Sequence, residues 1–231
     1  MPYSSSLKSR GRITVGILEI QGAFLEHQTA VTSAARSLGL EVDVEGVRQV
    51  SDIKPEIDGL IIPGGESTTI GLFLKRHHML EPLRSWIQSS GKVTWGTCAG
   101  MILLAKGMEN QKEGGQQSLQ AMDVVVSRNY FGRQINSFEQ EVEIVNPELI
   151  TQTGSSANSS KYLGVFIRAP AVVRITEPSV HVLAYLKKGD ADNKVIVACR
   201  QGNIISTAFH PELTEDTRWH RYFLNTIIAN K

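Results

Sequence analysis

A cysteine framed by glycines, in the run Gly96-Thr97-Cys98-Ala99-Gly100, constrains this chain more than any other feature. The residues before it (92–95) are typical of a strand, and those after it (101–105) are typical of a helix. Glycines at these positions let a strand turn sharply into a helix, as in the nucleophile elbow of serine hydrolases. Such a turn exposes the sulfur, and the N-terminus of the next helix favours the thiolate. The pattern therefore predicts an enzyme with Cys98 as its nucleophile.

The composition excludes several classes of function. The chain has 231 residues, of which 41% are hydrophobic and 20% charged, as in an ordinary globular protein. A net charge of +1 argues against nucleic acid as a partner. No apolar run approaches the roughly 20 residues that span a bilayer, so we expect no membrane association. The only cysteines are Cys98 and Cys199, which favours a reducing compartment. We therefore expect a cytoplasmic protein.

The order of the predicted elements indicates an α/β fold. Strand and helix alternate through the first hundred residues, which predicts a doubly wound, flavodoxin-like, mostly parallel sheet with helices on both faces. Some antiparallel strands are expected toward the C-terminal half, including a pair that turns at 201–203. The expected strands are 13–20, 40–47, 58–62, 92–95, 142–144, 163–167, 180–185, 194–199 and 204–209, and the helices are 23–38, 68–77, 80–89, 101–105 and 216–229.

We expect a single domain over residues 13–231, preceded by a flexible leader at 1–12. The leader contains serine, lysine and arginine but no hydrophobic segment, and this composition leaves organelle targeting as the alternative to a cytoplasmic location. Two polar segments, 109–118 and 151–160, predict surface loops. No internal repeat or domain linker divides the sequence.

A cysteine nucleophile needs a base, and the base needs a group that orients it. His210-Pro211-Glu212 follows an apolar strand, and the proline favours an extended conformation at His210. Residues i and i+2 of an extended segment project to the same side, so the sequence predicts that Glu212 orients His210. His77, His78, His181 and His220 are expected to be solvated or packed, and Cys199 to be structural. No residue spacing indicates a metal site.

The run Pro63-Gly64-Gly65-Glu66-Ser67-Thr68 allows two interpretations. Glycines after a strand let backbone N–H groups approach a substrate and point at a developing oxyanion. The same run is also consistent with a plain turn into a helix, with Ser67 or Thr68 as its N-cap. Both interpretations can hold together.

Several motifs together resemble the class I glutamine amidotransferases and, among them, the glutaminase subunits of pyridoxal 5′-phosphate synthase. The resemblance runs from about residue 13 to the C-terminus. The cysteine and histidine motifs indicate the superfamily, whereas the Arg-Asn and Ile-Arg-Ala-Pro motifs indicate the narrower group. The motifs are Gln21-Gly22-Ala23-Phe24-x-Glu26-His27, Pro63-Gly64-Gly65-Glu66-Ser67-Thr68, Gly96-Thr97-Cys98-Ala99-Gly100, Arg128-Asn129-x-Phe131-Gly132-Arg133-Gln134-x-x-Ser137-Phe138, Phe166-Ile167-Arg168-Ala169-Pro170 and Phe209-His210-Pro211-Glu212-Leu213.

The resemblance implies the chemistry. The thiolate of Cys98 attacks the side-chain carboxamide of L-glutamine, and His210, oriented by Glu212, protonates the departing ammonia. Water then releases glutamate from a γ-glutamyl thioester. The backbone N–H groups of Gly65 and Ala99 are the implied oxyanion donors. The implied glutamine-binding positions are Gly64, Gly65, Glu66, Arg128, Ile167 and Arg168.

The resemblance also implies a protein partner. Ammonia passes to the synthase subunit, a (β/α)₈ barrel, and docking activates the glutaminase. The positions implied to face this partner are Gln21, Phe24, Glu26 and His27. Glu19 departs from the apolar residue usual there and puts a charge beside the expected interface. No cofactor and no metal ion are expected in this subunit.

Other functions stay open at this point. A glutaminase of another biosynthetic pathway would keep the same triad and would differ in its synthase partner. A cysteine peptidase or hydrolase on the same scaffold would cleave peptides or esters without a partner. A regulatory binding protein would retain the fold without catalysis, which the intact set of cysteine, histidine and glutamate disfavours.

Overall fold

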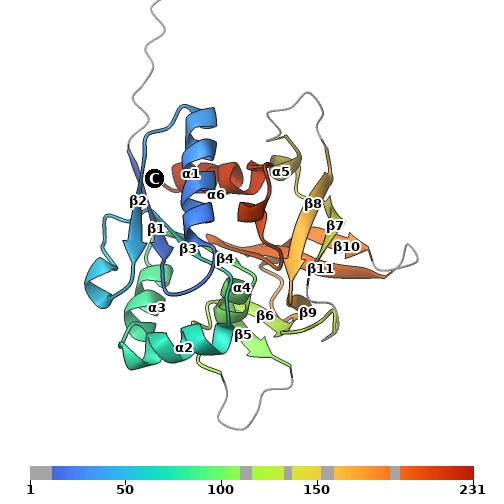
Figure 1. The fold of residues 1–231 in the computed structure, drawn as a ribbon, viewed down its shortest axis with the longest axis horizontal. Helices are drawn as coiled ribbons and strands as arrows, with labels where there is room; N and C mark the ends of the chain where they lie inside the picture. Colours follow the sequence, from blue (N-terminus) through green and yellow to red (C-terminus); the bar gives the residue numbers. More distant parts are fainter. Residues whose placement is uncertain (1–11, 110–115, 133–136, 152–158, 188–192) are drawn as a thin grey trace, which may run out of the picture.

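In the computed structural model a twelve-stranded sheet runs through the molecule, with helices on both sides of its N-terminal half (Figure 1). The structure describes residues 12–109, 116–132, 137–151, 159–187 and 193–231. Within these ranges the strands on one side of the sheet are all parallel and follow the spatial order β2-β1-β3-β4-β12. They are β1 (Ile13–Leu18), β2 (Val42–Val47), β3 (Gly59–Ile62), β4 (Val93–Thr97) and β12 (Ile204–Thr207). This is the flavodoxin-like order, so the fold prediction is confirmed.

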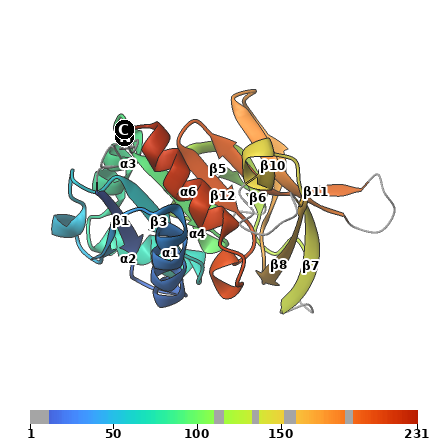
Figure 2. The same cartoon turned by 90° about the horizontal axis from the view of Figure 1, so that it is seen from above.

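Helices cover both faces of the parallel strands, which explains why β3 and β4 are buried at every residue. On one face lie α1 (Phe24–Leu38) and α6 (Arg218–Ala229), which run side by side (Figures 1 and 2). On the other face lie α2 (Ser67–Arg76) and α3 (Leu80–Gln88). As predicted, α1 ends at Gly39, which adopts the left-handed conformation with φ 63°.

Antiparallel strands extend the sheet beyond β12, as predicted for the C-terminal half. β11 (Lys194–Gln201) pairs with β12 through the expected turn at Gly202, and the order continues β10 (Val180–Lys187), β7 (Ser137–Ile144), β8 (Lys161–Ile167). A branch leaves β11 through β9 (Ala171–Ile175), β6 (Met122–Ser127) and β5 (Ala105–Met108). A short helix, α5 (Pro147–Thr151), packs near α6.

Several elements differ from the sequence prediction. β5, β6, β9 and α5 were not predicted, because each is short and each strand among them pairs with a partner distant in the chain. β1 ends at Leu18 rather than at 20, and β12 ends at Thr207 rather than at 209. Nearly all of the predicted leader and most of the predicted loops at 109–118 and 151–160 lie outside the described residues. So do Arg133 and Gln134 of the Arg-Asn motif.

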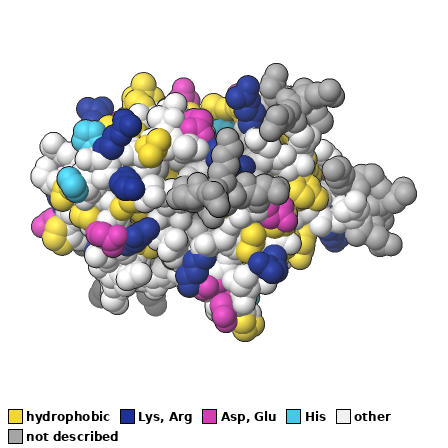
Figure 3. All heavy atoms as spheres, turned by 90° about the horizontal axis from the view of Figure 1, so that it is seen from below, with side chains coloured by type: hydrophobic (Ala, Val, Ile, Leu, Met, Phe, Trp, Pro, Cys, Tyr) yellow, Lys and Arg dark blue, Asp and Glu magenta, His cyan; other side chains and the backbone are white. Residues whose placement is uncertain are grey.

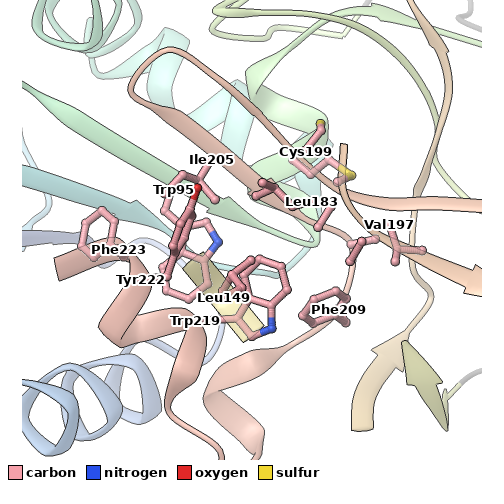
Figure 4. Packing of buried hydrophobic residues seen from close by; sticks show 14 of the residues in the cluster. Trp95, Leu149, Leu183, Val197, Cys199, Ile205, Phe209, Trp219, Tyr222 and Phe223 are labelled. Carbon is pink, nitrogen blue, oxygen red and sulfur yellow. The ribbon is translucent and has the colours of Figure 1, made fainter. Parts of the chain in front are cut away.

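The core is continuous from the parallel to the antiparallel half. Trp95 of β4 and Trp219 of α6 are 0–1% exposed and pack with Phe209 and Phe223 (Figure 4). The indole N–H of Trp95 donates to Oγ1 of Thr207 over 3.2 Å, which ties β4 to β12. Because these two strands are parallel neighbours, the residues that follow each of them meet at one edge of the sheet.

The surface seen in Figure 3 carries charges of both signs interspersed with hydrophobic side chains. This agrees with the near-neutral net charge of +1. Among the residues that the structure describes, no helix is both long enough and apolar enough to cross a membrane.

Candidate active site

The predicted elbow is present at the end of β4. Cys98 lies between β4 and the helix α4 (Ala99–Leu104) with φ 49° and ψ −103°, a strained conformation for a residue with a side chain. The flanking glycines are required, since a Cβ on Gly100 would lie 2.1 Å from the carbonyl oxygen of Ile62 and one on Gly96 would lie 2.5 Å from Gly100. The expected exposure of the sulfur is wrong: Cys98 is only 6% exposed, because the segments after β8 and β12 close over it.

His210 and Glu212 lie beside Cys98 after β12. Nδ1 of His210 and Oε1 of Glu212 are 2.8 Å apart, and both residues are buried. The backbone N–H of His210 donates to the carbonyl of Val165 over 2.8 Å, and the N–H of Cys98 donates to Thr207 over 2.8 Å. The elbow at Cys98 is therefore tied to β12, and the segment that carries His210 is tied to β8.

The route by which Glu212 reaches His210 differs from the prediction. His210 has φ −106° and ψ 85°, but Pro211–Leu213 form one turn of 3₁₀ helix rather than an extended segment. Pro211 stands at the first position of that turn, where a missing N–H costs little. The turn brings the carboxylate back to the imidazole.

Electrostatics favour a charged His210. Burial opposes its charge, but the neighbouring Cys98 and Glu212 outweigh burial and raise the pKa of His210 to about 10. Burial likewise opposes the charge of Glu212, but His27 and His210 outweigh it and lower the pKa of that carboxyl. The site thus holds a proton on His210 at neutral pH, where it can be transferred to a leaving group.

The loop after β3 lies directly against the imidazole. A Cβ on Gly64 would stand 2.4 Å from Cε1 of His210, so only glycine fits there. Gly65 has φ 138°, a conformation that side chains rarely adopt. The N–H of Glu66 donates to Oε1 of Gln21 over 2.9 Å, and a Cβ on Gly22 would lie 2.0 Å from the carbonyl oxygen of Gly64. Residues 21–22 therefore support this loop.

Glu66 caps α2 and pairs with Arg128. Its carboxylate accepts from the N–H groups of Thr68 and Thr69 over 3.1 and 2.7 Å, so Glu66 is the N-cap in place of Ser67 or Thr68. Arg128, which follows β6, donates to the same carboxylate over 2.9 Å. Burial opposes the charge of Glu66, but the hydrogen bonds from Thr69 and Thr68 outweigh burial and lower the pKa of the carboxyl. A cation and an anion thus stand together at the exposed rim of the site.

The end of β8 contributes a third wall. The sulfur of Cys98 lies 3.6 Å from the carbonyl oxygen of Ile167, toward which the thiol can donate. Arg168 follows with φ 46°, so the chain turns sharply there. Both residues are exposed. The structure therefore brings Ile167 to the nucleophile and places Arg168 at the surface beside it.

The positions implied to face a partner divide into two groups. Gln21 and Glu26 are exposed and Phe24 is half-buried, as an interface allows. His27 is completely buried, so the expectation that it lies at a surface is wrong. It belongs to the inward stripe of α1 with Ala30, Val31 and Ala34, a spacing that the sequence alone displays. Its ring faces Glu212 instead, with Nε2 3.3 Å from Oε2.

Cys199 and Glu19 each interact with a residue other than Cys98. Cys199 is completely buried, 3.1 Å from Oγ of Ser206, and burial raises the pKa of its thiol to about 11. The prediction that it is structural is confirmed. The side chain of Glu19 is 11% exposed and pairs with Arg48 over 2.6 Å, so its charge is neutralised within this chain.

Comparisons with known proteins agree on one family. A model of the SNO glutamine amidotransferase family matches residues 17–229. A protein of Arabidopsis thaliana named probable pyridoxal 5′-phosphate synthase subunit PDX2 is 44% identical over 92% of this chain and 85% of its own length. Subunit PdxT of the same synthase from Carboxydothermus hydrogenoformans is 44% identical over 92% of this chain and 97% of its own. A solved glutamine amidotransferase, 38% identical, superposes with a TM-score of 0.73 over 92% of this chain and 98% of that one.

Proposed function

This chain belongs to the SNO glutamine amidotransferase family, and on that premise we propose that it hydrolyses L-glutamine and supplies the ammonia to a pyridoxal 5′-phosphate synthase. The observation that carries the proposal is the meeting of Cys98, His210 and Glu212 at the carboxyl edge of the sheet, with the imidazole and the carboxylate 2.8 Å apart. These are the parts that nucleophilic acyl transfer requires.

The reaction proceeds in two steps. The thiolate of Cys98 attacks the side-chain carbonyl carbon of glutamine, and the N–H groups of Gly65 and Ala99 hold the oxyanion. The C–N bond then breaks as His210 gives its proton to the departing nitrogen, which leaves ammonia and a γ-glutamyl thioester. Next, His210 removes a proton from water, which attacks the thioester and releases glutamate. Glu212 keeps the imidazole oriented and offsets its charge throughout.

The rim holds the amino-acid end of the substrate. Free glutamine carries an α-carboxylate and an α-ammonium, and Arg128 and Glu66 offer the complementary charges 2.9 Å apart. Because Glu66 is already the N-cap of α2, it is held in place before the substrate arrives. Arg128 is the group that turns toward the α-carboxylate. The carbonyl of Ile167, the backbone of Gly64 and Arg168 complete the pocket wall.

The partner is a (β/α)₈-barrel synthase subunit that consumes ammonia and docks near the start of α1. The names of the relatives, which describe subunits of pyridoxal 5′-phosphate synthase, support this partner. Exposed Gln21 and Glu26 and half-buried Phe24 lie on that surface. We place the protein in the cytoplasm, because Cys98 and Cys199 are both free thiols.

The test is glutamate release from glutamine by the purified chain, with and without a pyridoxal 5′-phosphate synthase barrel subunit. We expect strong stimulation by the barrel subunit and no turnover by Cys98→Ala. Activity that ignores the subunit would refute the partner and leave the chemistry standing. Hydrolysis of peptides or esters in place of glutamine would refute the substrate.

A further inference from the structure

Behind Glu212, on the side away from His210, lies a buried pair of imidazoles with no part in the reaction described above. His27 of α1 and His220 of α6 are both 0% exposed, and Nδ1 of His27 is 3.1 Å from Nε2 of His220. The other ring nitrogen of His27, Nε2, lies 3.2 Å from Oγ1 of Thr97 and 3.3 Å from Oε2 of Glu212. The carboxylate is therefore flanked by an imidazole on each side.

The contacts fix which nitrogens carry protons. A carboxylate oxygen repels a lone pair, so Nε2 of His27 bears a proton. Its hydrogen bond goes to Oγ1 of Thr97, and the N–H lies beside Oε2 of Glu212. Burial lowers the pKa of His27 and that of His220, so both rings are neutral. Nδ1 of His27 then has a lone pair, and it accepts the Nε2–H of His220. This assignment leaves Nδ1 of His220 as a buried acceptor, consistent with its lack of any donor among the described residues.

Glu212 depends on this ring for one of its oxygens. Oε1 accepts from His210 over 2.8 Å. Oε2 is buried and has no conventional hydrogen bond within the described residues, and Nε2 of His27 lies 3.3 Å from it. A buried carboxylate oxygen without such a group would be strongly destabilised. Removal of His27 would therefore let Glu212 rotate or take up a proton, and either change weakens its hold on His210.

The surroundings hold the pair rigidly. The ring of Trp95 meets both imidazoles edge to face, with centroids 5.7 Å from His27 and 4.9 Å from His220. Trp95 belongs to β4, the strand that ends at Cys98. The described residues contain no group of three side chains arranged to hold a metal ion, so the cluster is not built as a metal site.

We propose that His27 is a positioning residue of the triad, which fixes the second carboxylate oxygen of Glu212, and that His220 holds His27 in the tautomer this requires. The inference deepens the proposed function and rests on it for the role of Glu212. It replaces the surface role that the sequence implied for His27. The alternative is that both rings merely fill space in the core, in which case an apolar residue of similar size would serve as well.

The experiment compares His27→Leu with His27→Gln. Leucine fills the space but has no donor, whereas glutamine can carry an N–H to the position of Nε2. Val31→Ala is the matched control, because Val31 lies one turn further along the same buried stripe of α1 and has no polar side-chain atom. Each variant is measured for kcat and KM with the barrel subunit present, and for the rate at which iodoacetamide alkylates Cys98 in the absence of glutamine and partner.

We expect His27→Leu to lower kcat by about 10-fold, the lower end of the effect of losing a polar contact to a charged group, with KM nearly unchanged. Its alkylation rate at neutral pH should fall as well. Glu212 would hold His210 less firmly, and His210 would then stabilise the thiolate less. His27→Gln should recover most of both losses, and Val31→Ala should keep both rates despite a lower melting temperature. A His27→Leu protein with wild-type rates, or a glutamine variant as impaired as the leucine variant, would overturn the proposal.

Should His27→Leu not fold, His220→Phe provides the second test. Phenylalanine keeps a ring against Trp95 but removes the donor to Nδ1 of His27, so the alkylation rate should fall. An unchanged rate would overturn the role of the pair. Failure of the proposed function has a different signature, because the wild-type protein itself would then release no glutamate with the barrel subunit present.

Discussion

Gly100 and the carbonyl oxygen of Ile62 make the contact on which the geometry of the elbow depends. A Cβ at position 100 would stand 2.1 Å from that oxygen. Carbon and carbonyl oxygen come no closer than roughly 3.3 Å in ordinary contacts, so Gly100→Ala must separate α4 from the end of β3 by roughly 1.2 Å. The two proposed oxyanion donors lie on opposite sides of this contact, Ala99 on α4 and Gly65 after β3.

The expected cost follows from that displacement. A misplacement of about 1 Å in an active site lowers the rate by about 100-fold, so we expect kcat for glutamate release to fall by about that factor. Overpacking of this kind also lowers the free energy of unfolding by about 1–3 kcal/mol. The variant should remain folded, because β3 is also held by its pairing with β4 from Gly59 to Ile62.

The assay is glutamate release with saturating barrel subunit, paired with urea denaturation of the isolated chain. Gly39→Ala is the control: Gly39 has φ 63°, but nothing lies within 4 Å of its Cβ position. It should lose about 1 kcal/mol through backbone strain and keep its kcat. A Gly100→Ala protein with wild-type kcat would refute the link between the β3–α4 contact and the oxyanion site.

Further predictions concern the thiols, the pH dependence and the substrate rim. Cys98→Ala should abolish turnover without lowering the melting temperature, whereas Cys199→Ser should keep its activity; a comparable loss in the second variant would contradict the assignment. Since the pKa of His210 is raised from its ordinary 6.5 to about 10, its stabilisation is complete below about pH 6.5 and is lost as pH rises toward 10. The free energy of unfolding, from urea titrations, should fall across that window, and His210→Asn should flatten the fall. Arg128→Met should raise KM for glutamine more than it lowers kcat, and an unchanged KM would remove Arg128 from the substrate site.

The sequence predicts the nucleophile well because its geometry is local. Two glycines, a strand before and a helix after suffice to place Cys98 on a tight corner, with no reference to the rest of the chain. The pairing of His210 with Glu212 is also local, although the 3₁₀ turn that achieves it was not predicted. Proline is compatible with both an extended segment and the first residue of a helical turn, so the motif does not choose between them.

Features that depend on distant contacts are not predictable in the same way. β6 and β9 exist because they pair with each other, and β9 also pairs with β11; short apolar segments carry no sign of their partners. The N-cap of α2 is Glu66 rather than Ser67 or Thr68. Glu66 also pairs with Arg128, which is distant in the sequence. The spacing of apolar residues in α1 places His27 on the buried face of the helix. Its contact with Glu212, in contrast, joins residues far apart in the sequence.

The central place of β12 has a consequence for synthesis of the protein. β12 lies between β4 and β11, yet it is the last strand to leave the ribosome. Until it emerges, the parallel and antiparallel halves lack the strand that joins them, and closure must wait for contacts of long sequence separation, which form slowly. His210 and Glu212 arrive only after β12. A nascent chain thus carries its nucleophile without a base while residues 99–209 are synthesised, and the enzyme becomes competent only when the sheet is complete.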